Sequence, residues 1–179
     1  MAHLTVSVEY AIHCLLWLAG SAGAPLSSRD LAELQGISQS FLAKIFPKLE
    51  KAGIVVGSEG VRGGYRLARA PAEISVLQIV DAIEGDKPLF DCQEIRDRCA
   101  VFGDAPPVWA TAGVCAIHAV MLKAEQAMRD ELAAHTLADL AVTFAGKAPP
   151  EFILQVQDWM TERAGARKPG RQSKPEPPS

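Results

Sequence analysis

The first apolar pattern in the chain runs from Thr5 to Ala19 and has the spacing of an α-helix. Its apolar residues recur three and four positions apart, so they form one broad face. These residues are Val8, Ile12, Leu15, Leu16 and Leu18. The segment SAGAP at 21–25 then interrupts the pattern with glycine and proline, so we predict that the first helix ends there.

A second, short helix is predicted within residues 28–35. Ser27 or Ser28 can cap it, because a serine hydroxyl accepts a hydrogen bond from the free N–H groups of a first helical turn. Leu31 and Leu34 are expected to face inward, and Gly36 to end the helix.

A third helix is predicted within residues 38–53, with Ser38 as its cap. Its buried stripe consists of Phe41, Leu42, Ile45 and Leu49. Two helices joined by a glycine-containing turn, the second with a small-polar start and basic flank, form a helix-turn-helix.

Two short segments with strand-forming residues follow, at 54–59 and 64–69. The glycine-rich sequence GVRGG at 60–64 joins them, which predicts a β-hairpin. A hairpin directly after a helix-turn-helix makes the unit a winged helix-turn-helix.

A long helix is predicted from Cys115 to Ala141. It carries an apolar stripe that a small winged helix can cover only in part, so we interpret it as a dimerisation helix. The stripe comprises Ile117, Val120, Met121, Ala124, Met128 and Leu132. An amphipathic helix is predicted at 151–165, and proline and charge predict a disordered tail beyond it.

The expected fold class is therefore mainly α with a small β-wing: a winged helix-turn-helix plus a long dimerisation helix. We divide the chain into a DNA-binding domain at 1–85, a cysteine-containing loop at 86–114, a helical region at 115–164 and a tail at 165–179.

The charge distribution agrees with a nucleic-acid partner, although the whole chain has a net charge of -3 and a pI near 5.8. Residues 26–69 contain seven basic and four acidic side chains, which leaves a local excess of three positive charges. Phosphate contact depends on such a local patch rather than on the total charge.

Three of the four cysteines fall in one stretch and are followed by a histidine. Cys92, Cys99, Cys115 and His118 have the spacing C-x6-C-x15-C-x2-H. Thiolates and an imidazole at such spacing are soft ligands for one metal centre, so the stretch indicates a metal or redox sensor. Cys14 lies in an apolar run instead, where a buried hydrophobic role is expected.

Other classes of protein are disfavoured. We find no P-loop, dinucleotide fingerprint, nucleophile elbow or paired carboxylates, so we do not expect an enzyme. Glu9 and His13 interrupt the N-terminal apolar run, and no apolar run reaches membrane-spanning length, so we expect a cytoplasmic protein without a membrane partner.

The sequence from Gly36 to Gly85 resembles the DNA-binding domain of the Rrf family of bacterial regulators, the group that contains IscR and NsrR. Its most specific parts are the GGYRLAR wing, the IS-x-x-x-IV-x-AIEG segment behind it, and the cysteine loop before a long helix. The resemblance covers roughly residues 3–140. It implies a homodimeric transcription regulator that in many members carries an iron–sulfur cluster.

The resemblance also implies site residues. Cys92, Cys99 and Cys115 match the cluster-ligand positions, for a [2Fe-2S] cluster or, as the alternative, a [4Fe-4S] cluster. His118 matches the fourth ligand of IscR-like members and is preferred, whereas Glu9 matches the acidic ligand that NsrR-like members take from the partner subunit. The second cysteine gap is longer than in the family and contains Pro106, Pro107 and Trp109.

A winged helix-turn-helix dimer is expected to bind an inverted repeat in double-stranded DNA. We expect Ser38, Gln39 and Ser40 near base edges and Lys44 and Lys48 near phosphates. Glu59 stands where the family commonly has a basic residue, which shifts the expected wing contact to Arg62. The wing contacts are assigned to Arg62, Gly63, Gly64 and Tyr65.

Three alternatives to a cluster sensor stay open: a cluster-free thiol or ligand sensor of the same fold, a zinc-stabilised DNA-binding module, and a helical interaction protein with no DNA role. Iron–sulfur clusters absorb visible light and zinc thiolates do not, so optical spectra distinguish the metal-based alternatives.

Overall fold

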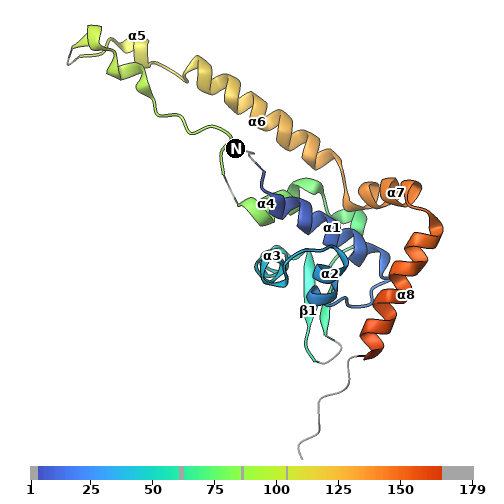
Figure 1. Ribbon diagram of the computed structural model, residues 1–179. Helices are drawn as coiled ribbons and strands as arrows, with labels where there is room; N and C mark the ends of the chain where they lie inside the picture. The colour runs from blue at the N-terminus through green and yellow to red at the C-terminus, as the bar shows by residue number, and fades with distance from the viewer. Residues whose placement is uncertain (1–3, 61–62, 86, 104, 167–179) are drawn as a thin grey trace, which may run out of the picture.

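The computed structural model describes residues 4–60, 63–85, 87–103 and 105–166. Arg62 of the predicted wing and residues 167–179 of the predicted tail lie outside the described residues. The chain forms a helical module that carries a two-stranded sheet, and an arm that projects from it (Figure 1). The predicted class, mainly α with a small β-wing, is confirmed.

The helix-turn-helix forms where the sequence predicts it. Helix α1 spans Val6–Gly20, α2 spans Ser28–Leu34 and α3 spans Gln39–Lys51. The Ser27 hydroxyl accepts from the backbone N–H groups of Arg29 and Asp30, which caps α2. Gly36 adopts a φ of +64°, a conformation that glycine reaches without steric cost, so the chain turns there into α3.

The wing is an antiparallel pair of strands, β1 at Val55–Ser58 and β2 at Gly64–Leu67. The backbone N–H and C=O of Tyr65 also exchange hydrogen bonds of 2.8 and 2.9 Å with Leu26, just before α2. This bridge attaches the wing to the helix-turn-helix. A Cβ atom at Gly64 would lie 2.4 Å from the Leu26 carbonyl oxygen, so the close approach requires glycine.

The core lies between α1, α3 and α4, which spans Val76–Glu84 behind the short 3-10 helix η1 at Pro71–Glu73. Phe46 is 1% exposed and stacks on Tyr65 of the wing, with ring centroids 4.3 Å apart. Full burial of a side chain of this size contributes about 1.5–3 kcal/mol. The predicted stripe of α3 omitted Phe46, while Leu42, Ile45 and Leu49 are buried as expected.

The arm consists of residues 87–115 and α6, which spans Ala116–Ala134. Its outer end carries the 3-10 helices η2 at Ile95–Arg98 and η3 at Ala100–Phe102 and the single-turn α5 at Val108–Thr111 (Figure 1). At its base, α6 is fixed to α4 by two hydrogen bonds of 3.0 and 2.9 Å from Arg129 to the Asp81 carboxylate.

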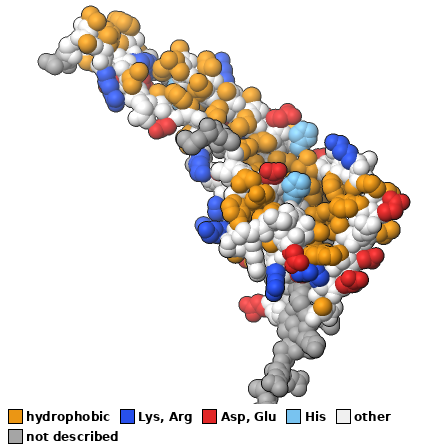
Figure 2. All heavy atoms as spheres, viewed as in Figure 1, with side chains coloured by type: hydrophobic (Ala, Val, Ile, Leu, Met, Phe, Trp, Pro, Cys, Tyr) orange, Lys and Arg blue, Asp and Glu red, His pale blue; other side chains and the backbone are white. Residues whose placement is uncertain are grey.

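The predicted apolar stripe of α6 is divided between two environments. Met121, Met128 and Leu132 are half-buried against the chain itself. Ile117 and Val120 are each 63% exposed, and Ala124 is exposed beside them. Figure 2 shows hydrophobic side chains along this arm and at its tip.

The prediction of one long helix from residue 115 to 141 is wrong. Helix α6 ends at Ala134, and a separate helix α7 spans Leu137–Lys147. The Thr136 hydroxyl accepts from the Asp139 N–H and the Asp139 carboxylate accepts from Thr136, which forms a capping box. Residues 135–137 also pair with 74–76, since Val76 N–H donates to the His135 carbonyl and Leu137 N–H to the Ile74 carbonyl.

The last described helix, α8 at Pro150–Ala166, packs back onto the module. Val156 and Met160 are buried in the common core. Arg163 pairs with the 5% exposed Asp30 at 3.2 Å and also with Glu33, both on α2, and lies over the Trp159 ring. The helix thereby fastens to the first helix of the helix-turn-helix.

One described stretch, Val108–Ala134, is long and apolar enough by composition to cross a membrane, although the sequence led us to expect none. Only 6% of its apolar window is buried. The stretch is divided by the non-helical residues 112–115, and the second half of α6 carries Arg129, Asp130 and Glu131.

We predict that Arg163→Ala lowers the free energy of unfolding by about 1–2 kcal/mol, because it leaves the Asp30 carboxylate buried without its Arg163 partner while Arg163 itself is partly solvated. Urea unfolding followed by circular dichroism measures the change. Arg98→Ala is the control, since the Arg98 and Asp97 side chains are 68% and 52% exposed, and it should have almost no effect. Equal losses in both variants would contradict the fastening role of α8.

Candidate functional site

The outward face of α3 contains the predicted base-reading residues. Ser38, Gln39, Ser40 and Lys44 are all exposed. Ser38 occupies the cap position but makes no capping bond, because its hydroxyl pairs with that of Ser40 at 2.8 Å. The polar start of α3 is therefore presented to solvent, as a recognition helix requires.

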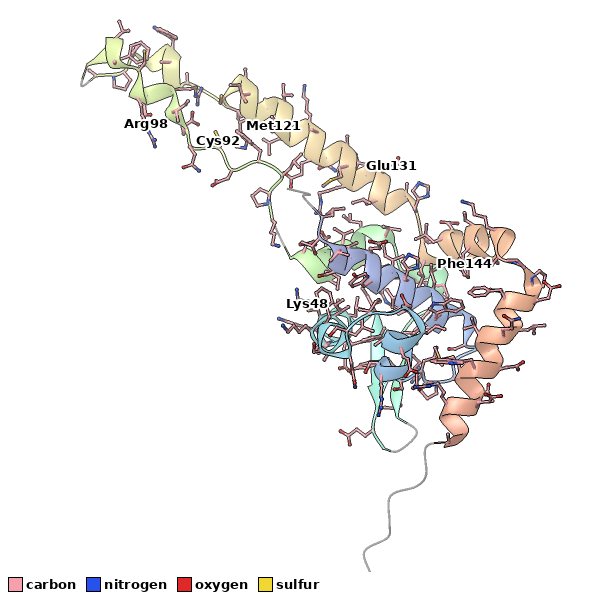
Figure 3. The ribbon with its side chains drawn as sticks, viewed as in Figure 1. Lys48, Cys92, Arg98, Met121, Glu131 and Phe144 are labelled. Carbon is pink, nitrogen blue, oxygen red and sulfur yellow. The ribbon has the colours of Figure 1, made fainter. Side chains whose placement is uncertain are left out.

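Lys48 has a structural contact that sequence reasoning did not foresee. Its ammonium donates a 2.6 Å hydrogen bond to the Ile83 carbonyl in the last turn of α4. A cation at this position satisfies a free carbonyl and complements the helix dipole. Lys48 (Figure 3) therefore connects α3 to α4, and both Lys48 and Lys44, one turn earlier on α3, are exposed.

On the wing, the predicted residues divide by role. A Cβ at Gly63 would lie 2.3 Å from the Ser58 carbonyl oxygen, so Gly63, like Gly64, is required by close backbone approach. Tyr65 uses its ring to pack on Phe46, and burial together with the charge of Glu50 raises the pKa of its hydroxyl. Arg66, which we did not assign to the interface, is exposed on β2; the two-residue alternation of strands was the signal for it.

The three clustered cysteines line one hollow of about 690 Å³ in the arm. Cys92 lies in the extended segment before η2, Cys99 lies between η2 and η3, and Cys115 is the cap residue of α6. Cys99 is exposed and the other two are half-buried. The remaining lining is largely apolar and includes Phe90, Phe102, Trp109 and Ile117.

The two candidates for a fourth ligand lie elsewhere. His118 is half-buried one turn into α6, with its ring centroid 6.1 Å from that of Phe90, and is not part of the lining. Glu9 is exposed on α1, where it lines a separate hollow of about 570 Å³ together with His13. Any contact between Glu9 and the cysteines would thus join the arm to a different part of the fold.

The donor set has the chemistry of an iron–sulfur site, since thiolates hold such clusters and one imidazole can complete them. Within the described residues, no three His, Cys, Asp or Glu side chains are close enough together to enclose a metal ion. The cysteines and the histidine thus match the donor chemistry of such a cluster, and among the described residues their side chains do not form a closed metal site.

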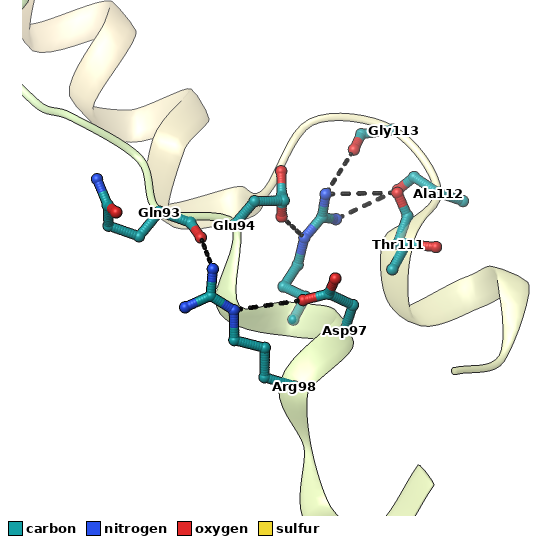
Figure 4. Close-up of polar contacts among 8 residues, drawn as sticks. Gln93, Glu94, Asp97, Arg98, Thr111, Ala112 and Gly113 are labelled. Carbon is teal, nitrogen blue, oxygen red and sulfur yellow. Dashed lines mark hydrogen bonds and ion pairs between the residues drawn. The ribbon is translucent and has the colours of Figure 1, made fainter. Parts of the chain in front are cut away.

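Arg96 organises the polar side of the hollow. Its guanidinium pairs with the Glu94 carboxylate and donates to the carbonyls of Thr111, Ala112 and Gly113 at 3.4, 3.5 and 3.0 Å (Figure 4). The hydrogen bond from Arg96 lowers the pKa of Glu94, and the charge of His118 adds to this effect. The Glu94 hydrogen bond raises the pKa of Arg96, and the charges of Cys115 and Cys92 act in the same direction, so Arg96 lies near both thiols.

The fold and the exposed recognition helix define a class, the winged helix-turn-helix transcription regulators. Within that class, the profile of the Rrf2 family, described as iron-dependent transcriptional regulators, matches residues 4–143. The chain belongs to the Rrf2 family, and the family resemblance seen in the sequence is confirmed.

Named relatives agree with this assignment. The chain is 33% identical over 138 residues to protein rrf2 of Nitratidesulfovibrio vulgaris, covering 76% of this chain and 85% of the relative. It is 42% identical over 90 residues to the regulator IscR of Aliivibrio salmonicida, covering 50% of this chain and 54% of that protein.

Two solved structures show the same fold. The structure of T. potens IscR superposes with a TM-score of 0.60 at 25% identity, covering 84% of this chain and 96% of that one. CymR, the global cysteine regulator of B. subtilis, has a TM-score of 0.62 at 23% identity, covering 80% and 98% of the two chains. The CymR comparison establishes a shared fold.

We predict that a thiol reagent distinguishes the cysteines in the native, metal-free protein. Burial raises the pKa of Cys14 to about 11, against a smaller opposing effect of the hydrogen bond from Gln35, so at pH 8 about one part in a thousand is thiolate. Cys99 should react first, then Cys92 and Cys115, and Cys14 at least about a hundredfold more slowly. Mass spectrometry of iodoacetamide-treated protein gives the order; early modification of Cys14 would contradict it.

Proposed function

We propose that this Rrf2-family regulator binds an inverted-repeat operator as a homodimer, and that an iron–sulfur cluster held by its cysteines controls its DNA affinity. The observation that carries the proposal is the shared hollow of Cys92, Cys99 and Cys115, although 15 residues separate Cys99 from Cys115. The likeness to IscR and the description of the family as iron-dependent support it.

The three cysteines would supply the thiolate ligands, and His118 is the preferred fourth ligand because it lies on α6 only three residues after Cys115. Glu9 is the alternative and would come from the partner subunit. A bound [2Fe-2S] cluster, or a [4Fe-4S] cluster in the alternative, supplies a centre whose charge and integrity respond to redox state, nitric oxide or iron supply.

The chain contains a continuous set of contacts from the cysteines to the recognition helix. Cys115 begins α6, and Arg129 on α6 grips Asp81 on α4. The last turn of α4 in turn receives Lys48 of α3 at the Ile83 carbonyl. A displacement of α6 is therefore transmitted to α3 through packed helices and two polar contacts.

The exposed stripe of Ile117, Val120 and Ala124 on α6 is where a second copy would bind. An amphipathic helix with an uncovered apolar face is a common two-fold interface, and two helix-turn-helix units related by a two-fold axis read an inverted repeat. In each half-site, Gln39 and its serine neighbours face base edges, Lys44 and Lys48 approach phosphates, and Arg62 is the expected contact of the wing.

A second candidate function is a cluster-free thiol sensor of the same fold. The exposure of Cys99 and the open arrangement of the described donors favour it. The visible spectrum of anaerobically purified protein decides between the two candidates: iron–sulfur charge-transfer bands support the cluster, and a colourless protein with reactive thiols supports the alternative. A colourless protein with bound zinc would indicate a structural metal site.

We predict that replacing Cys92, Cys99 or Cys115 by Ala abolishes bound iron and sulfide, whereas Cys14→Ala leaves both in place, because Cys14 is buried in the core. His118→Ala should change the cluster spectrum strongly and Glu9→Ala weakly. Iron and sulfide assays with absorption spectra measure both effects. A full cluster in Cys99→Ala would contradict the ligand set, and the opposite ranking of His118 and Glu9 would assign the fourth ligand to the partner subunit.

We predict that Gln39→Ala weakens binding to the specific operator by roughly 1–3 kcal/mol and relaxes base preference at one position in each half-site. Lys44→Ala should weaken all DNA sequences similarly and reduce the slope of log affinity against log salt by about one. Fluorescence anisotropy with an operator and a scrambled duplex measures both. An asymmetric footprint, or binding indifferent to Gln39, would contradict this docking.

A further inference from the structure

The chain between Cys99 and Cys115 makes a long excursion. Fifteen residues separate the two cysteines, and they contain η3, a turn at Gly103 and the single-turn α5. A free loop of this length would hold its ends together only weakly, because closing it costs conformational entropy. Nevertheless Cys115 lines the same hollow as Cys92 and Cys99. Some contact must return the end of the excursion to its start.

Arg96 makes that contact. It is one residue of η2, between Cys92 and Cys99, and its guanidinium bonds to three consecutive carbonyls at 111–113. These carbonyls are free because α5 ends at Thr111, and Gly113 with a φ of +66° turns the chain so that they are presented together. Cys115 follows two residues later and begins α6.

Glu94 completes the arrangement from the other side. Its carboxylate pairs with Arg96. Its backbone adopts a φ of +45°, a left-handed conformation that residues other than glycine and asparagine rarely take. The Arg96 side chain is only 22% exposed, so its charge is held against these partners instead of in open solvent. A guanidinium suits this position, because its planar fork of five donors serves a carboxylate and several carbonyls at once.

We propose that Arg96 is the positioning residue of the cysteine site: it closes the excursion between Cys99 and Cys115 and holds Cys115 beside Cys92. The ordering of the two cysteines is a property of the chain without metal. Its consequence for cluster retention rests on the proposed function.

Neighbouring Arg98 provides a matched control. It also belongs to η2, but it is 68% exposed and contacts only nearby residues, the Gln93 carbonyl at 3.3 Å and the Asp97 carboxylate at 3.9 Å (Figure 4). Removing Arg98 takes away the same charge from the same short helix without releasing residues 111–113.

The test measures the proximity of Cys92 and Cys115 in the full-length, metal-free chain. With Cys14 and Cys99 replaced by Ala, only these two thiols can react with a short bis-maleimide. Mass spectrometry gives the ratio of two products: chains in which one reagent molecule joins both thiols, and chains in which each thiol has reacted with its own reagent molecule. We expect Arg96→Ala to reduce this ratio about tenfold, since the effective concentration of one thiol at the other falls when the excursion is released.

The control and a conservative variant define the cause. Arg98→Ala should stay within about twofold of the parent, because its contacts are local. Arg96→Lys should resemble Arg96→Ala, since a lysine ammonium lacks the planar fork. Thermal unfolding should be the same in all variants, because the core of the winged-helix module lies away from this tip. An unchanged ratio in Arg96→Ala, or an equal loss in Arg98→Ala, would overturn the proposal.

Iron and sulfide content of the reconstituted protein, with all four cysteines present, then separates this proposal from the proposed function. If the protein binds a cluster, Arg96→Ala should lose most of it and Arg98→Ala should keep it. If the protein binds no iron but the cross-link still depends on Arg96, the cluster assignment fails and the positioning role stands. If the cluster and cross-link both survive in Arg96→Ala, the positioning role fails and the cluster assignment stands.

Discussion

The structure depends on the last turn of α4, a helix of nine residues on which three other helices converge. Its buried face, formed by Val76, Ile79, Val80 and Ile83, belongs to the core. Its polar face receives Thr5 at the start of α1 through Glu84, Lys48 of α3 through the Ile83 carbonyl, and Arg129 of α6 through Asp81. Helix α3 and helix α6, which follows Cys115, therefore share one support.

The arm carries the three clustered cysteines and projects from the core. No residue of α6 is fully buried, and its apolar residues Met121, Met128 and Leu132 are half-buried. A second copy that covers Ile117 and Val120 would complete the surface and set the spacing of two recognition helices. Helix α6 thus carries both the exposed residues Ile117 and Val120 and, at its cap position, Cys115.

The cysteine site is built around the long gap between Cys99 and Cys115. A long gap makes it harder for the chain to bring Cys115 back to the other two cysteines. The three cysteines nevertheless line one hollow. Residues of this gap contribute apolar lining through Trp109 and Phe102, whose rings meet edge to face at 5.8 Å. The gap also ends close to the carbonyls of 111–113, which accept hydrogen bonds from Arg96 on the other side of Cys99.

Sequence alone determined features that depend on neighbours in the chain: a serine cap at the start of α2, the Gly36 turn, the inward Leu42, Ile45 and Leu49 of α3, and the hairpin of the wing. Local hydrogen bonds and side-chain periodicity define these elements, and both are visible in a short window of residues. Only the tertiary structure decided that α6 ends at Ala134, that Lys48 donates to the Ile83 carbonyl, and that Arg96 donates to the carbonyls of 111–113. Each of these depends on a partner at least 15 residues away in the chain, such as the pairing of 135–137 with 74–76. Packing decides which distant backbone group a given side chain contacts. Many backbone groups along the chain could accept the same hydrogen bond, and only the folded arrangement brings one of them within reach.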